Sequence, residues 1–437
     1  MIFTGLHIFS KSCISAYVLG HVGKSELAGG ALSIAFVNVT GFSLISGLAM
    51  GMDGITSQAF GARNFSLMAR TLHQTILILL AAFIPICIMW LNAEPILVFL
   101  GQDRKVASLA GTYTYYTIPT LLLQCFFLPT KVYLRAKKVT KPFLIGAPLA
   151  IVFHIVANGV LFWLDFGLEG VALAVAVTDF VYLFTLLVYL YTTGDISINS
   201  FDFIECFTEL RSILSLAIAS CLSVCLEWWF YELMIFFSGL LPHDKEAAIS
   251  AMNILLQATS FIYVFPSSIS MGVSARVGHE LGADMPEQAK YASYVAVSCA
   301  VVTSLIALAL AFVTRDLWGW VFMSDSATDS LVSAAMLVLG LCELGNCSQT
   351  VISGVIRGCA RPRFVAWVNF GSFYLIGLPM ALFLGFRKET GFRKEMGFVG
   401  LWEGLFVAQV ACVLCMLVSL WRIDWEREAT EAQELVN

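Results

Sequence analysis

The feature that most constrains this chain is a series of long apolar segments, because about 20 apolar residues suffice to cross a bilayer as a helix. We count twelve such segments, in a chain that is 59% hydrophobic and only 13% charged. Soluble domains carry about 25% charged residues, so we predict an all-α polytopic membrane protein. The segments cover residues 1–20, 28–57, 70–92, 107–134, 142–164, 168–192, 211–238, 247–275, 289–313, 330–356, 364–386 and 398–422.

The spacing of these segments predicts two lobes of six helices. The one long polar connection, "TTGDISINSFDFIECFTELR", follows the sixth segment. We therefore expect an N-terminal lobe at 1–192, a cytoplasmic linker at 193–210, a C-terminal lobe at 211–422 and a cytoplasmic tail at 423–437. The first segment begins directly at Met1, and we interpret it as a truncated first helix that lacks its N-terminal part.

Similar loops in the two halves indicate an internal repeat. "SQAFGARNFSLMAR" after the second segment matches "GHELGADMPEQAK" after the eighth, and "YLRAKKVTKPF" after the fourth matches "VIRGCARPRF" after the tenth. A displacement by six spans preserves orientation in the membrane, so the halves are related by a pseudo-twofold axis along the membrane normal. Secondary transporters bind substrate between such repeats, which makes alternating-access transport the predicted function.

The charged residues predict the topology and exclude other classes of function. Fifteen of the 25 Lys and Arg residues fall on the side of the termini and nine on the other, so we expect both termini to be cytoplasmic. The small net charge of −5 is spread along the chain and does not favour nucleic-acid binding. The 12 Cys and six His residues show no metal-ligand spacing. Since no nucleophile–base pair or phosphate-binding loop is recognisable either, we expect no metal, no cofactor and no enzymatic activity.

Four motifs, in order and suitably spaced, resemble the multidrug and toxic compound extrusion (MATE) family and its plant DETOXIFICATION branch. They are "GLAMGMDGITSQAFGAR", "ARVGHELGADMPEQAKYA", "VISGVIRGCARPRF" and "VNFGSFYLIGLPMALFLGF". The resemblance covers nearly the whole chain and implies the MATE fold of twelve helices in two lobes. It implies efflux of organic solutes in exchange for H⁺, or for Na⁺ in some bacterial members. The chain departs from the family pattern in "DGITSQAFG", and in Asn346 where plant relatives often carry aspartate.

The stretch "SCLSVCLEWWFYELMIFF" places a carboxylate, Glu227, within the seventh apolar segment. A carboxylate at the bilayer centre costs roughly 2.5–3.5 kcal/mol, so it should face a cavity or a partner. "CLEWW" matches the glutamate that the family uses to carry protons, which assigns that role to Glu227 by resemblance. Trp228, Trp229 and Tyr231 are candidates to bind a flat or cationic substrate. The alternative is a structural, hydrogen-bonded glutamate beside tryptophans that face lipid.

Three further carboxylates in apolar segments are candidate site residues, namely Glu343, Asp53 and Asp179. Glu343 and Asn346 are three residues apart and share a helix face. We hypothesise that Glu343 replaces the missing aspartate and couples protons together with Glu227, with Asn346 in the substrate site. The alternative is a lone buried glutamate capped by Asn346. Asp53 is a third candidate for proton coupling, and Asp179 for a second site.

The expected partners are an organic small molecule, H⁺ as the coupling ion and the lipid bilayer, with the chain acting as a monomer. We expect the protein in the plasma membrane or in an endomembrane, vacuolar or late endosomal. The alternative function is a truncated membrane protein that does not transport and acts through interaction or regulation.

Overall fold

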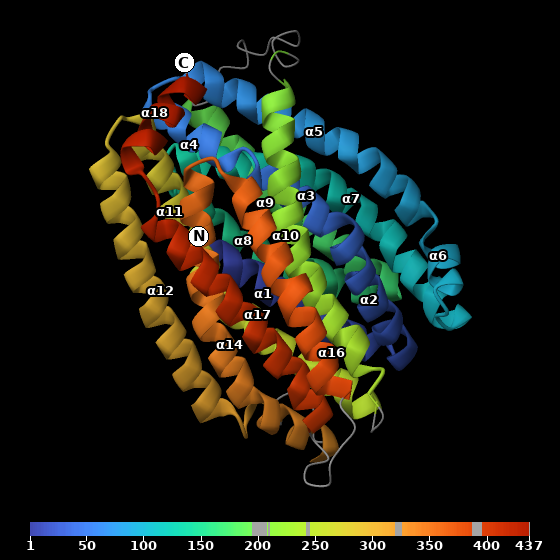
Figure 1. The fold of residues 1–437 in the computed structure, drawn as a ribbon. Coiled ribbons are helices and arrows are strands. Elements are labelled where there is room, and N and C mark those ends of the chain that lie inside the picture. The colour runs from blue at the N-terminus through green and yellow to red at the C-terminus, as the bar shows by residue number, and fades with distance from the viewer. Residues whose placement is uncertain (195–207, 209, 242–244, 320–325, 387–395, 437) are drawn as a thin grey trace. The chain divides into compact units, whose positions relative to one another are not determined.

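The computed structural model describes the chain except for residues 195–207, 209, 242–244, 320–325, 387–395 and 437 (Figure 1). Most of the predicted linker at 193–210 therefore lies outside the described residues. In the part described, all regular elements are helices. They are α1 (Ile2–Val22), α2 (Lys24–Val37), η1 (Asn38–Phe42), α3 (Ser43–Met50), α4 (Asp53–Gly61), α5 (Phe65–Leu91), α6 (Ala93–Phe99), α7 (Arg104–Ala136), α8 (Lys141–Trp163), α9 (Gly167–Thr193), α10 (Leu210–Ser238), α11 (Lys245–Gly282), α12 (Pro286–Thr314), α14 (Ser326–Gly358), α15 (Pro362–Asn369), η4 (Phe370–Gly377), α16 (Leu378–Phe386), α17 (Met396–Trp421) and α18 (Trp425–Val436).

Twelve helical spans among the described residues are long and apolar enough to cross a membrane. The predicted fold class and number of spans are therefore confirmed, and the chain is a multi-pass membrane protein. Two of the spans contain a π-helical turn, η1 within Ser25–Gly61 and η4 within Pro362–Phe386. Such widened turns are frequent near functional sites, and η4 lies next to the site described below.

The chain divides into two compact units, Met1–Cys221 and Leu222–Asn437. The division falls inside α10, so the first turns of this helix belong to the N-terminal unit and its remainder to the C-terminal unit. The predicted lobe bounds, 1–192 and 211–422, differ from this division by the start of α10 and remain a prediction.

In the N-terminal unit, α7 packs against α2, α5 and α9, and α8 packs against α9 and α1. The core between α5 and η1 is centred on Trp90, whose indole nitrogen donates to Thr40 Oγ1 at 2.9 Å. Gly41 makes room for this ring, because a Cβ there would lie 2.2 Å from the indole. The η1 turn is thus fixed by one close packing contact and one buried hydrogen bond.

In the C-terminal unit, α14 is the central helix and packs against α11, α12 and α17. The gold α12 and the orange α14 run side by side in Figure 1. Small residues allow the close approach of α14 to α11, since a Cβ on Gly354 would lie 2.4 Å from the carbonyl oxygen of Ser270. Small residues at helix contacts are typical of membrane proteins, where tight packing drives helix association.

The segment that sequence analysis treated as a tail contains the helix α18, which packs on α11 and α12. Its buried residues, Trp425, Ala429, Ala432 and Val436, follow the spacing of one helix face. Gln433 Nε2 donates to the carbonyl oxygen of Gly282 at 2.9 Å, at the end of α11. The helix therefore supplies a donor to the last carbonyl oxygen of α11.

Candidate functional site

Glu227 lies on α10 in the C-terminal unit and is half-buried. Its Oε1 accepts a hydrogen bond from Gln349 Nε2 of α14 at 3.0 Å. Phe230 lies three residues further on the same helix face, and its ring packs against Phe373 of η4 at 5.3 Å between centroids. This aromatic contact holds the face of α10 that carries Glu227 against the interior of the unit.

Glu343 lies on α14 and is 1% exposed. Asn346 Nδ2 donates to Glu343 Oε2 at 2.9 Å, and Cys347 Sγ lies 3.8 Å from the same oxygen. Glu343 and Asn346 therefore lie on one face of α14, as the sequence predicted. Asn346 caps the carboxylate, as in the structural alternative, while its own Oδ1 is buried and has no hydrogen-bond partner among the described residues.

A chain of polar contacts extends from Glu227 across the unit. Gln349 Oε1, on the other side of the amide that binds Glu227, lies 3.1 Å from Cys412 Sγ of α17. The same thiol is 3.6 Å from Asn369 Oδ1, and Asn369 Nδ2 donates to the carbonyl oxygen of Ser223 on α10 at 3.0 Å. Four helical elements, α10, α14, α17 and α15, are thus joined around Glu227 by neutral groups.

Tyr231 is one turn from Glu227 on the same face of α10. Its hydroxyl accepts a hydrogen bond from Gln409 Nε2 of α17 at 3.3 Å. Gly345 of α14 lets Gln409 approach closely, because a Cβ on this glycine would lie 2.8 Å from the Gln409 Cβ. Tyr231 therefore joins α10 to α17 beside Glu227.

Neither Glu227 nor Glu343 forms an ion pair with any residue in the described ranges. Arg357, near the end of α14, attracts Glu227 electrostatically, but its Nη2 donates to Ser270 Oγ at 2.7 Å instead. The groups in hydrogen-bond contact with the two carboxylates are amides and a thiol. Each can remain in place whether the carboxylate is ionised or protonated, since Asn, Gln and Cys carry no charge to be left unpaired.

The other candidate carboxylates lie in the N-terminal unit and have cationic partners. Asp53 of α4 is 2% exposed and binds Arg135 Nη2 of α7 at 2.6 Å. Asp179 of α9 binds Lys11 Nζ of α1 at 2.5 Å and accepts from Gln124 Nε2 at 2.7 Å. Asp53 is therefore not brought together with Glu227 and Glu343 within one unit.

The two tryptophans predicted to bind substrate follow Glu227 on α10. Trp228 is half-buried and Trp229 is 37% exposed. At 100° per residue, they lie about 100° and 200° around the helix from Glu227. Tyr231 and Asn346 are in contact with the carboxylate network, whereas the tryptophans lie on other faces of the helix.

Sequence analysis missed Gln349, Gln409 and Cys412, which are all fully buried in spans of the C-terminal unit. These residues could have been found from the sequence, because they are polar residues inside apolar segments. A polar group buried in a membrane span needs a hydrogen-bond partner. Cys412 and Cys415 are both free thiols, the first buried and the second exposed.

His154 and Asn158 of α8 form local hydrogen bonds. His154 Nδ1 lies 2.8 Å from Thr178 Oγ1, its Nε2 lies 3.1 Å from Ser15 Oγ, and Asn158 Nδ2 donates to the His154 carbonyl oxygen at 2.8 Å. Among the described residues, no group of three or more His, Cys, Asp or Glu side chains has an arrangement that holds a metal ion.

Comparisons with known proteins find relatives that match nearly the full length of the chain. A family model described as MatE matches residues 1–160 and 219–383. Protein DETOXIFICATION 51 of Arabidopsis thaliana is 45% identical over 99% of this chain and 80% of its own length. Protein DETOXIFICATION 49 of the same plant is 43% identical over 100% of this chain and 86% of its own length.

Solved structures show the same fold. The eukaryotic MATE transporter AtDTX14 superposes with a TM-score of 0.93 at 28% identity, covering 100% of this chain and 96% of that protein. A multidrug resistance MATE family transporter in an outward-facing conformation superposes with a TM-score of 0.83 at 16% identity, covering 100% of this chain and 94% of that protein. The second likeness concerns the fold alone.

Proposed function

The chain belongs to the MATE family of multidrug and toxic compound extrusion transporters, and on this premise we propose that it exports an organic solute in exchange for protons. The names of its relatives, DETOXIFICATION proteins, support an organic or xenobiotic solute as the substrate. We assign proton coupling to Glu227 and Glu343 of the C-terminal unit.

The observation that carries this assignment is that the side chains hydrogen-bonded to the two carboxylates are uncharged. Glu227 is held by the amide of Gln349 and Glu343 by the amide of Asn346. Such partners tolerate protonation, because no buried cation loses its counter-charge when the carboxylate becomes neutral. Glu227 is half-buried and therefore the more accessible of the two, so it exchanges its proton with water or a cationic substrate.

The proton gradient supplies enough free energy for this cycle. One proton that crosses about 100 mV yields ~2.3 kcal/mol, and each pH unit adds ~1.36 kcal/mol. Since 1.4 kcal/mol is a tenfold factor, the voltage alone supports an accumulation of roughly 50-fold.

We place both chain termini on the cytoplasmic side of the membrane, because the distribution of Lys and Arg residues favours this orientation. The protein then resides in the plasma membrane or in an endomembrane, and the chain works as a monomer without a bound cofactor.

The test is proton-driven uptake of a fluorescent organic cation into inverted vesicles that contain the full chain. We expect Glu227→Gln and Glu343→Gln to abolish uptake, because a glutamine keeps the shape of the side chain and loses the titratable group. The matched control is Glu232→Gln. Glu232 lies five residues after Glu227 on α10, about 140° around the helix, so we expect this variant to transport like the wild type. Uptake by Glu227→Gln at the wild-type rate, or uptake driven by Na⁺ alone, would contradict the proposal. A folded wild type without uptake of any organic cation or anion would favour the interaction protein instead.

A further inference from the structure

The amide of Gln349 is held between two residues of the C-terminal unit. Its Nε2 donates to Glu227 Oε1 at 3.0 Å, and its Oε1 lies 3.1 Å from Cys412 Sγ. A side-chain amide has donors on its nitrogen and an acceptor on its oxygen, so the thiol is the donor to Oε1. Two successive hydrogen bonds therefore point from α17 through α14 towards Glu227 on α10.

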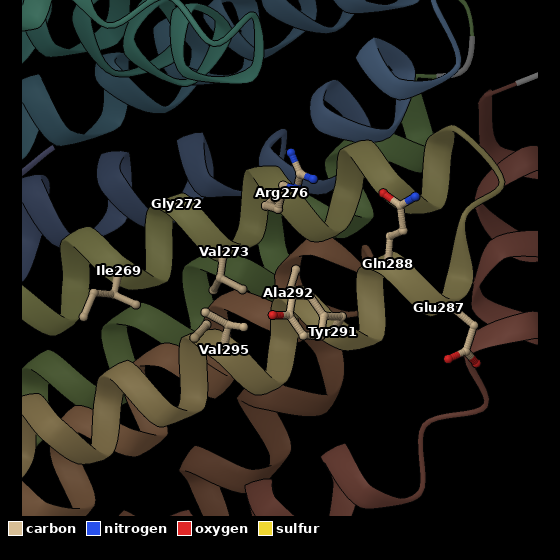
Figure 2. A pocket seen from close by; sticks show the side chains of 10 residues that line it. Ile269, Gly272, Val273, Arg276, Glu287, Gln288, Tyr291, Ala292 and Val295 are labelled. Carbon is tan, nitrogen blue, oxygen red and sulfur yellow. The ribbon is translucent and has the colours of Figure 1, made fainter.

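The first two groups of this chain of hydrogen bonds are buried inside the protein. Gln349 and Cys412 are both 0% exposed, and buried polar groups find their hydrogen-bond partners within the fold. Neither residue lines the groove between α11 and α12 that Figure 2 shows. The orientation of the Gln349 amide therefore depends on the two residues that it contacts.

Only one orientation of this amide suits an ionised Glu227. With Nε2 towards the carboxylate, the amide donates to a charged acceptor. With the amide reversed, Oε1 would face Glu227, and this arrangement suits a protonated carboxyl group that can itself donate. The Cys412 thiol supports the first orientation, because after reversal only the sulfur, a weak acceptor, would be left for Nε2. Successive hydrogen bonds also polarise one another, which strengthens the bond to the charged oxygen.

The thiol has other polar neighbours besides Gln349. Cys412 Sγ lies 3.6 Å from Asn369 Oδ1, and Ser372 of η4 is a further hydrogen-bond partner of the thiol. Asn369 is itself held, since its Nδ2 donates to the Ser223 carbonyl oxygen at 3.0 Å. Of the two amide oxygens near the sulfur, Gln349 Oε1 is the closer, at 3.1 Å. The shorter distance indicates that the S–H group donates to Gln349.

We propose that Cys412 is a positioning residue that favours the ionised form of Glu227 by orienting the amide of Gln349. The inference rests on the proposed proton coupling by Glu227 and adds a residue that adjusts it. Without the thiol donor, the amide is no longer held with Nε2 towards Glu227. The ionised carboxylate then loses part of its hydrogen bonding, and Glu227 keeps its proton to a higher pH.

The test is infrared difference spectroscopy on the purified full chain during a pH titration, because a protonated carboxyl group has its own C=O band. The band that is lost in Glu227→Gln identifies Glu227. We expect Cys412→Ala to raise the midpoint of this band by about half a unit to one unit, the range that one hydrogen bond contributes. Cys412→Ser restores a donor to Oε1 and should lie closer to the wild type than to Cys412→Ala. An unchanged midpoint in Cys412→Ala would overturn the proposal.

Cys415 provides the matched control, since it is a free and exposed thiol on the same helix. We expect Cys415→Ala to titrate like the wild type. A shift as large as that of Cys412→Ala would mean that any change in α17 disturbs Glu227, and the specific role of Cys412 would be refuted.

A double-mutant cycle tests whether the thiol acts through the amide. In the Gln349→Leu background, Cys412→Ala should cause no further shift of the Glu227 band, because the connecting group is already absent. A shift of equal size in both backgrounds would contradict the role given to Gln349.

The other ionisable groups around Glu227 are the same in all of these variants. Among the described residues they are Tyr231 of α10, Tyr263 of α11 and Arg357 of α14. A Glu227 band that titrates but does not respond to Cys412 would overturn this inference alone. If no Glu227 band titrates in the wild type, the proposed proton coupling fails together with it.

Discussion

The two units differ in how they accommodate a carboxylate inside a membrane span. In the N-terminal unit, Asp53 and Asp179 each meet a cation, Arg135 and Lys11 respectively. In the C-terminal unit, Glu227 and Glu343 meet amides. An ion pair is a fixed arrangement, because removal of either charge leaves the other buried and unpaired.

This difference indicates two roles for a carboxylate inside a membrane span. A paired carboxylate holds helices together, as Asp53 holds α4 to α7 and Asp179 holds α9 to α1. A carboxylate with neutral partners can lose and regain a proton while its surroundings stay intact. From this comparison we propose that the N-terminal carboxylates stabilise the fold and that the C-terminal carboxylates exchange protons. Substitutions of the carboxylates and of their partners test this proposal.

The largest effect is expected for Asp53→Asn. It removes the counter-charge of Arg135, whose side chain is 8% exposed, and breaking a buried pair in this way costs about 3–5 kcal/mol. We expect a clear fall in the melting temperature of the purified protein in detergent. The double variant Asp53→Asn/Arg135→Met should recover most of it, because neither charge then remains. If Asp53→Asn were as stable as the wild type while transport was lost, Asp53 would belong with the proton-coupling group.

A smaller loss of stability is expected for Lys11→Met. Lys11 is 15% exposed, so water compensates part of the lost pair, and Gln124 still donates to Asp179. We expect a cost of about 2–3 kcal/mol, below that for a fully buried pair. Lys11→Arg serves as the control, since it keeps the charge. Equal melting temperatures for Lys11→Met and Lys11→Arg would show that the pair with Asp179 is not needed for the fold.

The next prediction concerns the amide that holds Glu227. Gln349→Leu removes the donor to Glu227 Oε1, and a hydrogen bond to a charged group contributes about 1.5–3 kcal/mol. We expect proton-driven transport to fall about tenfold or more. Gln74→Leu is the control, because Gln74 is an equally buried amide in the N-terminal unit that donates to the Thr208 carbonyl oxygen. A similar loss of transport in both variants would point to a general packing defect.

The last prediction concerns Glu428 of α18, which combines burial with a cationic partner. Burial raises its pKa to about 7, although the nearby Arg361 lowers it; Glu431, Arg427 and Asp424 are the other charged groups near it. A free glutamate has a pKa of about 4.3. Packing of α18 against α11 and α12 therefore favours the protonated form of Glu428. The resulting stabilisation of the packed α18 helix is present below about pH 4.3 and is lost as the pH rises through about 7.

We therefore expect hydrogen exchange of Trp425–Val436 to become faster between about pH 5 and about pH 8, after correction for the intrinsic exchange rate. In Glu428→Gln this dependence should disappear. Slower exchange of the helix at the higher pH would show that the attraction to Arg361 outweighs the cost of burial.

The positions of the membrane spans, and the family, were predictable from the sequence. A run of apolar residues of sufficient length becomes a membrane helix wherever it packs, so the twelve spans depend on local composition. Glu227 and Glu343 were recognisable as candidates for the same reason, because a carboxylate in an apolar segment is conspicuous. Local spacing also predicted that Glu343 and Asn346 share a face, and the bond between them is present.

The partners of Asp53, Asp179 and Glu227 were decided by the tertiary structure alone. Asp53 and Arg135 are 82 residues apart in the chain, Glu227 and Gln349 are 122 apart, and Lys11 and Asp179 are 168 apart. No periodicity connects such positions, because their contact depends on which helices pack together and at what rotation. Whether a membrane carboxylate meets a cation or an amide is a property of that packing. The sequence therefore identified the charged groups, and only the fold distinguished a carboxylate paired with a cation from one hydrogen-bonded to an amide.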